Sequence, residues 1–234
     1  MKRGGEVFVD YPLTSIRNST NGADYPVVIS SNSGLPEIHT KYLLTCAGLQ
    51  SDRISQLSGC NAVPKIVPFR GEYLLLKPEK RHLVKTNIYP VPDPRFPFLG
   101  VHFTPRMNGD VWLGPNAVLA YKREGYSYFD VSPTDLFDAI SFRGMQKLMV
   151  KYVKQLQRFI PELQVSDVTR GPSGVRAQAM DSEGNLVEDF VFDDGEGPIA
   201  SRVLHVRNAP SPGATSSLAI ANMITEKATE KFHL

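Results

Sequence analysis

Residues 42–54 decide the fold class, and they read Tyr42-Leu43-Leu44-Thr45-Cys46-Ala47-Gly48-Leu49-Gln50-Ser51-Asp52-Arg53-Ile54. The first six residues form a short, nearly all-apolar run, which is typical of a strand buried on both faces of a parallel sheet. Gly48 ends this run, and Ser51 begins a short helical turn. Small residues at such a turn let a ligand approach the backbone, and a helix start offers N–H groups to an anion. The stretch predicts an α/β domain with a binding edge, although many strand-to-helix turns carry glycine without binding anything.

A second strand-to-helix segment lies near the other end of the sequence. Small and hydroxylic residues, Asn208 to Ser216, lead from an expected strand, Arg202–Arg207, into a helix expected from about Thr215 to Phe232. This arrangement directs N–H groups and the positive end of the helix toward whatever lies above them. A reduced flavin carries negative charge on its pyrimidine side, so such a helix start would favour electron uptake. Ordinary helix capping is the alternative interpretation.

The region between these segments has the character of an antiparallel sheet. Short strands punctuated by Pro and Gly are expected at Arg70–Lys77, Leu83–Val91, Phe98–Phe103 and Val111–Leu113, with a hairpin at Asn108-Gly109. A helix opens at Ser132-Pro133 and carries an apolar stripe as far as Ile160. Further strands are expected at Glu6–Val9, Pro26–Ser30, Val175–Met180 and Leu186–Phe192. We expect an interrupted domain at 1–63 and 171–234, with a second domain at 64–170 between its two parts.

The overall composition excludes several classes of function. The 234 residues carry a net charge of +2, which is too small to indicate a nucleic-acid partner. No apolar stretch approaches the roughly 18 residues of a membrane span. The start at Met1 predicts neither a secretory signal nor a transit peptide. The two cysteines, Cys46 and Cys60, match no metal-ligand spacing, and no metal site is expected.

One apparent dinucleotide motif is interpreted as a turn. Gly195-Glu196-Gly197-Pro198-Ile199-Ala200 fits the pattern G-x-G-x-x-A. That pattern should open a helix, whereas Val203–Val206 reads as a strand. Acidic residues in and before the motif would also repel a pyrophosphate.

Four polar residues in the expected strands are candidates for chemistry, namely Arg70, Tyr89, His102 and Arg176. Paired arginines suit a dicarboxylate, because each guanidinium binds a carboxylate through two parallel hydrogen bonds. A histidine with a pKa near neutrality can remove an alcohol proton while hydride leaves the carbon. Each residue alone is more often structural, and sequence spacing does not bring the four together.

Taken in order, these segments resemble one family. Residues 45–54 resemble the second flavin-contacting motif of the D-amino-acid-oxidase-like FAD oxidoreductases, and Ile66–Tyr73 resembles the strand that opens their substrate domain. A closer resemblance, to the L-2-hydroxyglutarate dehydrogenases, rests on five segments: Asn87–Pro92, Gly100–Arg106, Leu113–Ala117, Gly171–Gln178 and Asn208–Ser217. The resemblance covers nearly the whole chain.

The resemblance implies an FAD-dependent oxidoreductase fold that oxidises L-2-hydroxyglutarate to 2-oxoglutarate by hydride transfer to FAD. It implies a substrate site of Arg70, Tyr89, His102 and Arg176, with His102 as the base. It also implies flavin contacts from ten residues: Leu13, Ala47, Gly48, Asp52, Asn208, Ser211, Gly213, Ala214, Thr215 and Ser216. The setting implied is mitochondrial, with an electron acceptor that is not a soluble nicotinamide and is otherwise unknown. Association with a membrane surface is left open.

Two departures from the family pattern bear on this expectation. The strand–turn–helix that grips the ADP phosphates would precede Met1, and the stretch between Tyr126 and Pro161 is shorter than is usual in the family. The fold is therefore expected to be incomplete, and this chain alone to bind FAD weakly or not at all. Two alternatives remain: an oxidase of an amino acid or related amine, and a non-catalytic fragment that binds a full-length copy.

Overall fold

The computed structural model describes residues 4–20, 24–89, 91, 102–115, 118–127, 130–141 and 168–234. These fall into two compact units, of which unit 1 comprises Met1–Pro64 and Val187–Leu234 and unit 2 comprises Lys65–Leu186. The second boundary lies at Leu186 and not at the expected residue 170. The reason is that strand β9 (Val168–Met180) pairs along its length with β5 (Lys65–Leu76), which keeps both strands in one sheet.

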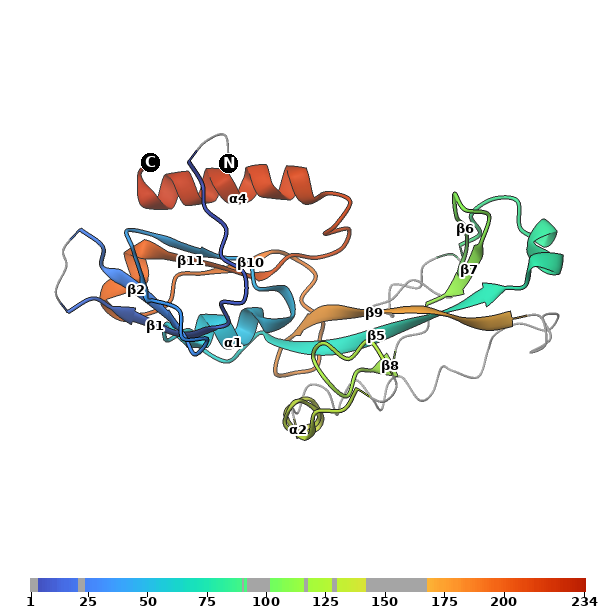
Figure 1. Cartoon of the computed structure of the whole chain (residues 1–234), viewed down its shortest axis with the longest axis horizontal. Helices are drawn as coiled ribbons and strands as arrows, with labels where there is room; N and C mark the ends of the chain where they lie inside the picture. Colours follow the sequence, from blue (N-terminus) through green and yellow to red (C-terminus); the bar gives the residue numbers. More distant parts are fainter. Residues whose placement is uncertain are drawn as a thin grey trace. The chain divides into compact units, whose positions relative to one another are not determined.

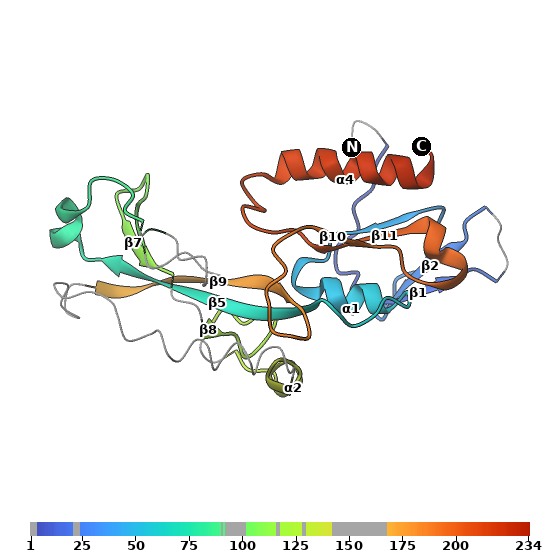
Figure 2. The same cartoon turned by 180° about the vertical axis from the view of Figure 1, so that it is seen from behind.

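Unit 1 contains a three-stranded sheet with a helix on each face (Figures 1 and 2). Its strand order is β10 (Val191–Asp193), β11 (Val203–Asn208), β4 (Leu43–Thr45). The short helix α1 (Ser51–Gln56), which follows a 3₁₀ turn η1 (Gly48–Gln50), packs on β11. The C-terminal helix α4 (Ser217–Phe232) lies on the other face.

The prediction that β4 belongs to a parallel sheet is confirmed, because β4 and β11 run parallel with Leu43 opposite Val203. The predicted burial of β4 on both faces is wrong. β4 is the edge strand of this sheet, and Leu44 is 42% exposed. It is β11, the central strand, in which all six residues are buried.

A second, antiparallel sheet in unit 1 has the order β1 (Leu13–Asn18), β2 (Val27–Ser31), β3 (Ile38–Thr40). Its apolar residues Ile16 and Val27 pack with Ile199 of the 3₁₀ helix η4 (Gly197–Arg202) and with Val203. The strand expected at Glu6–Val9 does not form. Its apolar side chains are more than 60% exposed, since an apolar run without a pairing partner gains no ladder hydrogen bonds.

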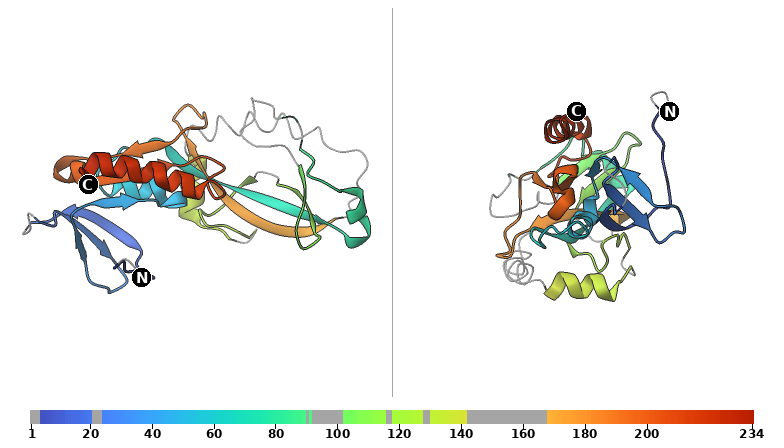
Figure 3. Two further views of the ribbon diagram at one scale, coloured as in Figure 1. Left: turned by 90° about the horizontal axis from the view of Figure 1, so that it is seen from above. Right: turned by 90° about the vertical axis from the view of Figure 1, so that its left-hand side faces the viewer.

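Unit 2 is the antiparallel sheet that the sequence predicts. Its strands follow the order β6 (His102–Pro105), β7 (Val111–Gly114), β5, β8 (Val118–Leu119), and β9 pairs with β5. Figure 3 shows β5 and β9 running side by side along their length. The β6–β7 hairpin turns at Asn108-Gly109 as predicted, and Gly109 takes a φ of +84° that glycine tolerates without strain.

Other predicted elements of unit 2 are partly confirmed. The strand expected at Leu83–Val91 is wrong, because Pro78–Leu83 forms a 3₁₀ helix, η2, and Ile88 makes only an isolated bridge to Phe103. Helix α2 (Pro133–Ser141) begins where expected, and the Ser132 hydroxyl accepts the Asp135 N–H at 3.3 Å. The helix predicted as far as Ile160 lies outside the described residues beyond Ser141, as do residues 98–101 of the strand expected at Phe98–Phe103. In the described ranges, no helix has both the length and the apolar character that crossing a membrane requires.

Candidate functional site

The two predicted cofactor segments of unit 1 meet at one edge of its sheet. β4 and β11 are adjacent and parallel, with Thr45 opposite His205, so their carboxyl ends lie together. Ala47-Gly48 follows the first strand and Ala209–Ser216 follows the second. The Ser51 hydroxyl donates to the Arg207 carbonyl at 2.8 Å and fixes α1 against the end of β11. In open α/β sheets, ligands bind outside the carboxyl ends of the strands, which is where these segments lie.

The backbone at this edge is open to a ligand. Gly48 has a φ of +51°, and a Cβ added there would meet nothing within 4 Å. A Cβ added at Gly213 would come no closer than 3.7 Å to another atom. A side chain at either position would fill space that is open here. Glycine at both positions therefore lets a flat ring system approach the backbone.

The start of α4 is organised by backbone hydrogen bonds. The N–H of Ser216 donates to the Pro212 carbonyl at 3.0 Å, and that of Ser217 donates to the Ala214 carbonyl at 3.3 Å. Ser216 makes no side-chain capping bond, so capping by its hydroxyl does not explain the hydroxylic segment. Ser211, Ala214 and Thr215 are exposed, and Gly213 is half-buried.

Three of the predicted cofactor residues have structural contacts instead. Asp52 is 2% exposed, and its carboxylate accepts the Arg53 N–H at 2.8 Å. The amide nitrogen of Asn208 donates to the carbonyls of Val187 and Asp189 at 2.9 and 2.7 Å. Leu13 packs against the core of the antiparallel sheet. Contact of these three side chains with a cofactor stays a prediction.

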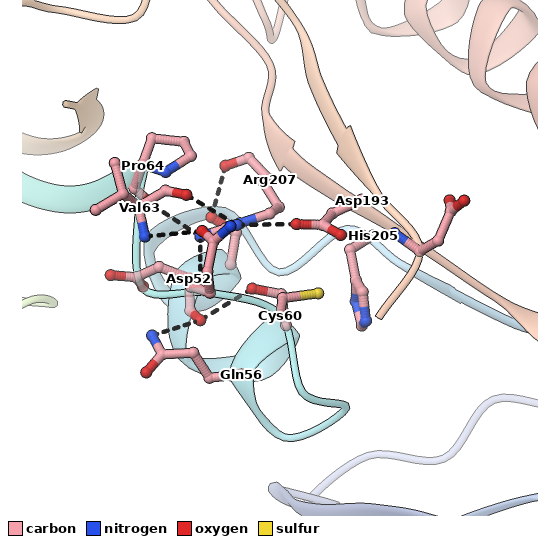
Figure 4. A network of polar contacts seen from close by, with 12 residues as sticks. Asp52, Gln56, Cys60, Val63, Pro64, Asp193, His205 and Arg207 are labelled. Atoms are coloured by element: carbon pink, nitrogen blue, oxygen red, sulfur yellow. Dashed lines mark hydrogen bonds and ion pairs between the residues drawn. The ribbon is translucent and has the colours of Figure 1, made fainter. Parts of the chain in front are cut away.

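A buried arginine holds this edge of the sheet in place (Figure 4). The Arg207 side chain is 1% exposed and forms an ion pair with Asp193 at 3.0 Å. It also donates to the carbonyls of Asn61, Val63 and Pro64 at 2.9–3.2 Å. Burial alone raises the pKa of Asp193, but hydrogen bonds, with Arg207 first, more than offset this and hold it below its ordinary value. The network ties residues 61–64 to β10 and β11.

His205, the neighbour of this network on β11, is fully buried between two hydroxyls. Its Nδ1 lies 2.7 Å from Thr45 Oγ1 and its Nε2 lies 2.6 Å from Ser58 Oγ. Ser58 donates its own proton to the Ser55 carbonyl at 2.9 Å, so Nε2–H of His205 donates to Ser58 and Thr45 donates to Nδ1. Burial lowers the pKa of His205 to about 4, which keeps the ring neutral at pH 7. The sequence analysis singled out neither Arg207 nor His205, although two ionisable groups in an otherwise apolar strand indicate buried polar partners.

The interpretation of the G-x-G-x-x-A match as a turn is confirmed. Gly195 has a φ of +74°, and a Cβ added there would lie 2.8 Å from the Ser58 hydroxyl. The Glu196 N–H donates to the Ser58 carbonyl at 2.8 Å. Gly195 therefore allows close packing against Ser58, which lies just beyond the end of α1, and Gly197 begins the short 3₁₀ element η4.

In unit 2 the structure brings together His102 and Tyr89. Their rings stack with centroids 4.6 Å apart and an interplanar angle of 23°. Two backbone hydrogen bonds between Ile88 and Phe103, of 3.0 and 2.9 Å, hold the adjacent residues in this position. Tyr89 is half exposed, so the stacked pair is accessible to a small molecule in this unit.

The two predicted arginines are separated by the sheet. Arg70 pairs with Val175 and Phe69 pairs with Arg176, and because opposed residues share a face, the arginines point to opposite faces. Arg70 is 2% exposed, bonded to Glu72 at 2.8 Å and to the Ser127 carbonyl at 2.8 Å. Arg176 is exposed. Arg176 lies on the face of β5 that also carries Tyr73.

Comparisons with known proteins agree with the resemblance seen in the sequence. The family described as "FAD dependent oxidoreductase" matches residues 1–227. The chain is 66% identical over its whole length to "L-2-hydroxyglutarate dehydrogenase, mitochondrial" of Caenorhabditis briggsae, and 57% identical over 99% of its length to the protein of that name in Homo sapiens. It spans 58% and 55% of these relatives, or little more than half their length.

Solved structures show the same fold at much lower identity. An FAD-bound L-alpha-glycerophosphate oxidase from Mycoplasma pneumoniae superposes with a TM-score of 0.60 at 17% identity, over 96% of this chain and 50% of that one. An FAD complex of glycerol-3-phosphate dehydrogenase from Bacillus halodurans gives 0.53 at 14% identity, over 96% and 39%. These likenesses show the fold alone. The match of the family over residues 1–227 shows that the chain belongs to the FAD dependent oxidoreductase family.

Proposed function

We propose that the protein carrying this chain oxidises L-2-hydroxyglutarate to 2-oxoglutarate by hydride transfer to FAD. The observation that carries the proposal is the placement of His102, stacked on Tyr89 at the surface of the antiparallel sheet. Relatives that bear the name of this activity are 54–66% identical over nearly the whole chain. A histidine that can accept a proton is the group that oxidation of an alcohol requires of the protein.

The described residues fit an FAD. The sheet edge at the carboxyl ends of β4 and β11 carries Gly48, Gly213 and the N-terminal end of α4. The backbone at both glycines is open, so no side chain there blocks the approach of a ring system. FAD, when bound, accepts the hydride and thus both electrons of the oxidation. Ala47, Gly48 and the segment Ser211–Ser216 are the residues we assign to it.

The residues of unit 2 perform the remaining chemistry. His102 accepts the hydroxyl proton of the substrate on an imidazole nitrogen, while the C–H bond at the same carbon breaks and its electron pair leaves as hydride. A C=O double bond forms, which gives the 2-oxo acid and balances the reaction. Arg176, which is exposed, binds a substrate carboxylate through its guanidinium.

Arg70 receives a different assignment from the one that the resemblance implies. Its guanidinium contacts Glu72 and the Ser127 carbonyl, and it is almost fully buried. We assign it to holding the segment around Ser127 against β5. A buried ion pair of this kind positions the elements on which substrate residues lie.

The cellular setting and partners are also carried over as proposals. The named relatives are mitochondrial proteins, and we assign this protein to mitochondria. Its small-molecule partner is a dicarboxylate, and its electron acceptor is a carrier other than a soluble nicotinamide.

Steady-state kinetics with an artificial electron acceptor test the substrate assignment. The flavin-loaded protein should oxidise L-2-hydroxyglutarate with a kcat/KM at least about tenfold above that for L-lactate, because a monocarboxylate leaves one charged site unpaired. Preferential oxidation of glycine or sarcosine would instead support the amine-oxidase alternative. A protein that retains flavin but oxidises none of these compounds would support the non-catalytic alternative.

A further inference from the structure

One face of the sheet formed by β5, β6 and β7 is polar and aromatic, while the other is apolar. Phe103 and Leu113 point to the side where Leu76, Val111 and Val84 form a hydrophobic cluster. Residues alternate across a strand, so His102 and Trp112 point the other way. Such alternation marks a sheet with one face in the core and one face available for binding.

Five residues outside the apolar core gather on this second face. The rings of Tyr73 and Trp112 lie 5.0 Å apart, and the Arg106 guanidinium lies 4.3 Å over the Trp112 ring. The stacked pair of Tyr89 and His102 completes the group, and the Tyr73 pKa is raised by burial first and by Tyr89 second, with Arg106 opposing. Tyr73 and Tyr89 are therefore close enough to influence each other.

The middle strand leaves room between these groups. His102 of β6 is opposite Gly114 of β7, and Gly114 in turn adjoins β5, where an added Cβ would lie 2.9 Å from the Glu72 carbonyl and 3.4 Å from the Cα of Tyr73. β7 therefore places no side chain of its own between His102 and Tyr73. Neighbouring strands are separated by about 4.8 Å, so the backbones of these two residues lie about two strand spacings apart.

Arg106 has a charge that the described part of the chain does not neutralise. The neighbouring Arg81 forms an ion pair with Asp110 at 2.7 Å, and Arg70 forms one with Glu72, but Arg106 forms none within the described ranges. Tyr73 is half-buried, and its hydroxyl likewise makes no hydrogen bond to a described residue. A guanidinium fixed over the Trp112 ring, with the Tyr73 phenol on the other neighbour of that ring, matches a ligand that is anionic and accepts hydrogen bonds.

A second cationic group lies on the same face. Phe69 pairs with Arg176, and Phe69, Gly71 and Tyr73 alternate along β5, so Arg176 and Tyr73 share a face about 13 Å apart along the strand. Between them Gly71 pairs with Gly174, where an added Cβ would meet nothing within 4 Å. The Gly71–Gly174 row, which carries no side chains, thus separates Arg176 from Tyr73 along the sheet.

We propose that Arg106 and Tyr73, supported by Trp112, form a carboxylate-binding subsite that holds the distal carboxylate of a dicarboxylate. His102 lies on the same face, on β6, two strands from Tyr73 of β5. This subsite rests on the proposed function for the identity of the substrate. The subsite adds the residues that distinguish a dicarboxylate from a monocarboxylate. The Arg106 guanidinium provides this discrimination, because it can bind a planar carboxylate through two hydrogen bonds.

Trp112 makes the subsite testable without flavin turnover, because it is the only tryptophan of the 234-residue chain. Titration of this chain with glutarate should change tryptophan emission saturably, and L-lactate should not. Arg106→Gln should weaken glutarate binding about tenfold or more, and Tyr73→Phe should weaken it less. Arg17→Gln, which removes the same charge from a surface ion pair on β1, should bind like the unaltered chain.

Two results would overturn the subsite. One is an emission that glutarate does not change, or changes equally in the Arg106→Gln chain, with circular dichroism showing that both chains are folded. The other is equal or tighter binding of glycerol 3-phosphate, which would assign the subsite to phosphate. If glutarate binds as expected but L-2-hydroxyglutarate is not oxidised by the flavin-loaded protein, the subsite stands and the proposed reaction fails.

Discussion

Arg70 and Arg176 lie in adjacent rows of the β5–β9 ladder and point to opposite faces of the sheet. A single small molecule bound on one face therefore cannot be held directly by both guanidinium groups. Their surroundings differ accordingly, because Arg70 is 2% exposed and bonded to Glu72 while Arg176 is exposed. The two residues have the same side chain, and we propose different roles for them.

Substitution should separate these roles. Arg70→Met leaves the Glu72 carboxylate, which is 14% exposed, without its cation, so the free energy of unfolding should fall by about 3–5 kcal/mol. Arg176→Met should change it by less than about 0.5 kcal/mol but raise KM for L-2-hydroxyglutarate at least about tenfold. Urea unfolding and steady-state kinetics measure the two effects. A stable Arg70→Met protein with a raised KM would reverse the assignment.

His102 should affect turnover more than binding. In the flavin-loaded protein, His102→Asn should lower kcat by about 10²–10⁴-fold with little change in KM, since a positioned base acts in the transition state. His82→Asn, at an exposed position of η2, is the matched control and should leave kcat unchanged. Equal turnover in both variants would make His102 a structural residue of β6.

The buried His205 predicts how stability depends on pH. Its pKa is about 4 in the folded chain and about 6.5 when unfolded, so the unfolded chain binds more protons between these values. The stability contributed by the neutral ring is complete above about pH 6.5 and is lost as pH falls toward 4, amounting to about 3 kcal/mol. Below this window, carboxylates with lowered pKa, such as Asp193, dominate the further loss.

Urea unfolding between pH 7 and pH 4 measures this dependence. His205→Gln should flatten the curve across that window, while His82→Gln at an exposed position should keep the slope of the unaltered chain. A slope that survives in His205→Gln would show that another group titrates there.

The turn at Gly195 should be sensitive to a single methyl group. Gly195 and Gly34 both have positive φ, +74° and +80°, so alanine costs about 1–2 kcal/mol of backbone strain at each. At Gly195 the added Cβ also lies 2.8 Å from Ser58 Oγ, whereas at Gly34 it meets nothing within 4 Å. Gly195→Ala should therefore destabilise the chain by at least about 1 kcal/mol more than Gly34→Ala in thermal or urea unfolding. Equal losses of stability in the two variants would show that the loop carrying Ser58 shifts to accept the added methyl group without cost.

Sequence patterns predicted the elements whose signals are local. The apolar run ending at Gly48 gave a strand next to a helix, Asn108-Gly109 gave the hairpin, and Ser132-Pro133 began a helix. The parallel pairing of β4 with β11 was expected in kind, because a run of apolar residues suits a buried sheet. The prediction of a strand at Glu6–Val9 is wrong, because apolar composition alone does not provide a strand to pair with.

The site was less predictable, because it depends on register. Nothing in the spacing of Arg70 and Arg176 shows that Phe69, and not Arg70, lies opposite Arg176. A shift of one residue moves every side chain to the other face, so sequence alone left the faces open. The stacking of Tyr89 on His102 was equally out of reach, because it depends on a bridge between Ile88 and Phe103.

Anaerobic mixing of the flavin-loaded protein with one substrate at a time tests whether this fold oxidises a 2-hydroxy dicarboxylate. The measured signal is the visible absorption of oxidised flavin, and the measurement needs no added electron acceptor. L-2-Hydroxyglutarate should bleach this absorption in a single phase and yield 2-oxoglutarate in proportion to the flavin reduced, and His102→Asn should slow that phase about 10²-fold or more. Flavin that stays oxidised with L-2-hydroxyglutarate but is bleached by glycine or sarcosine would contradict the proposed reaction.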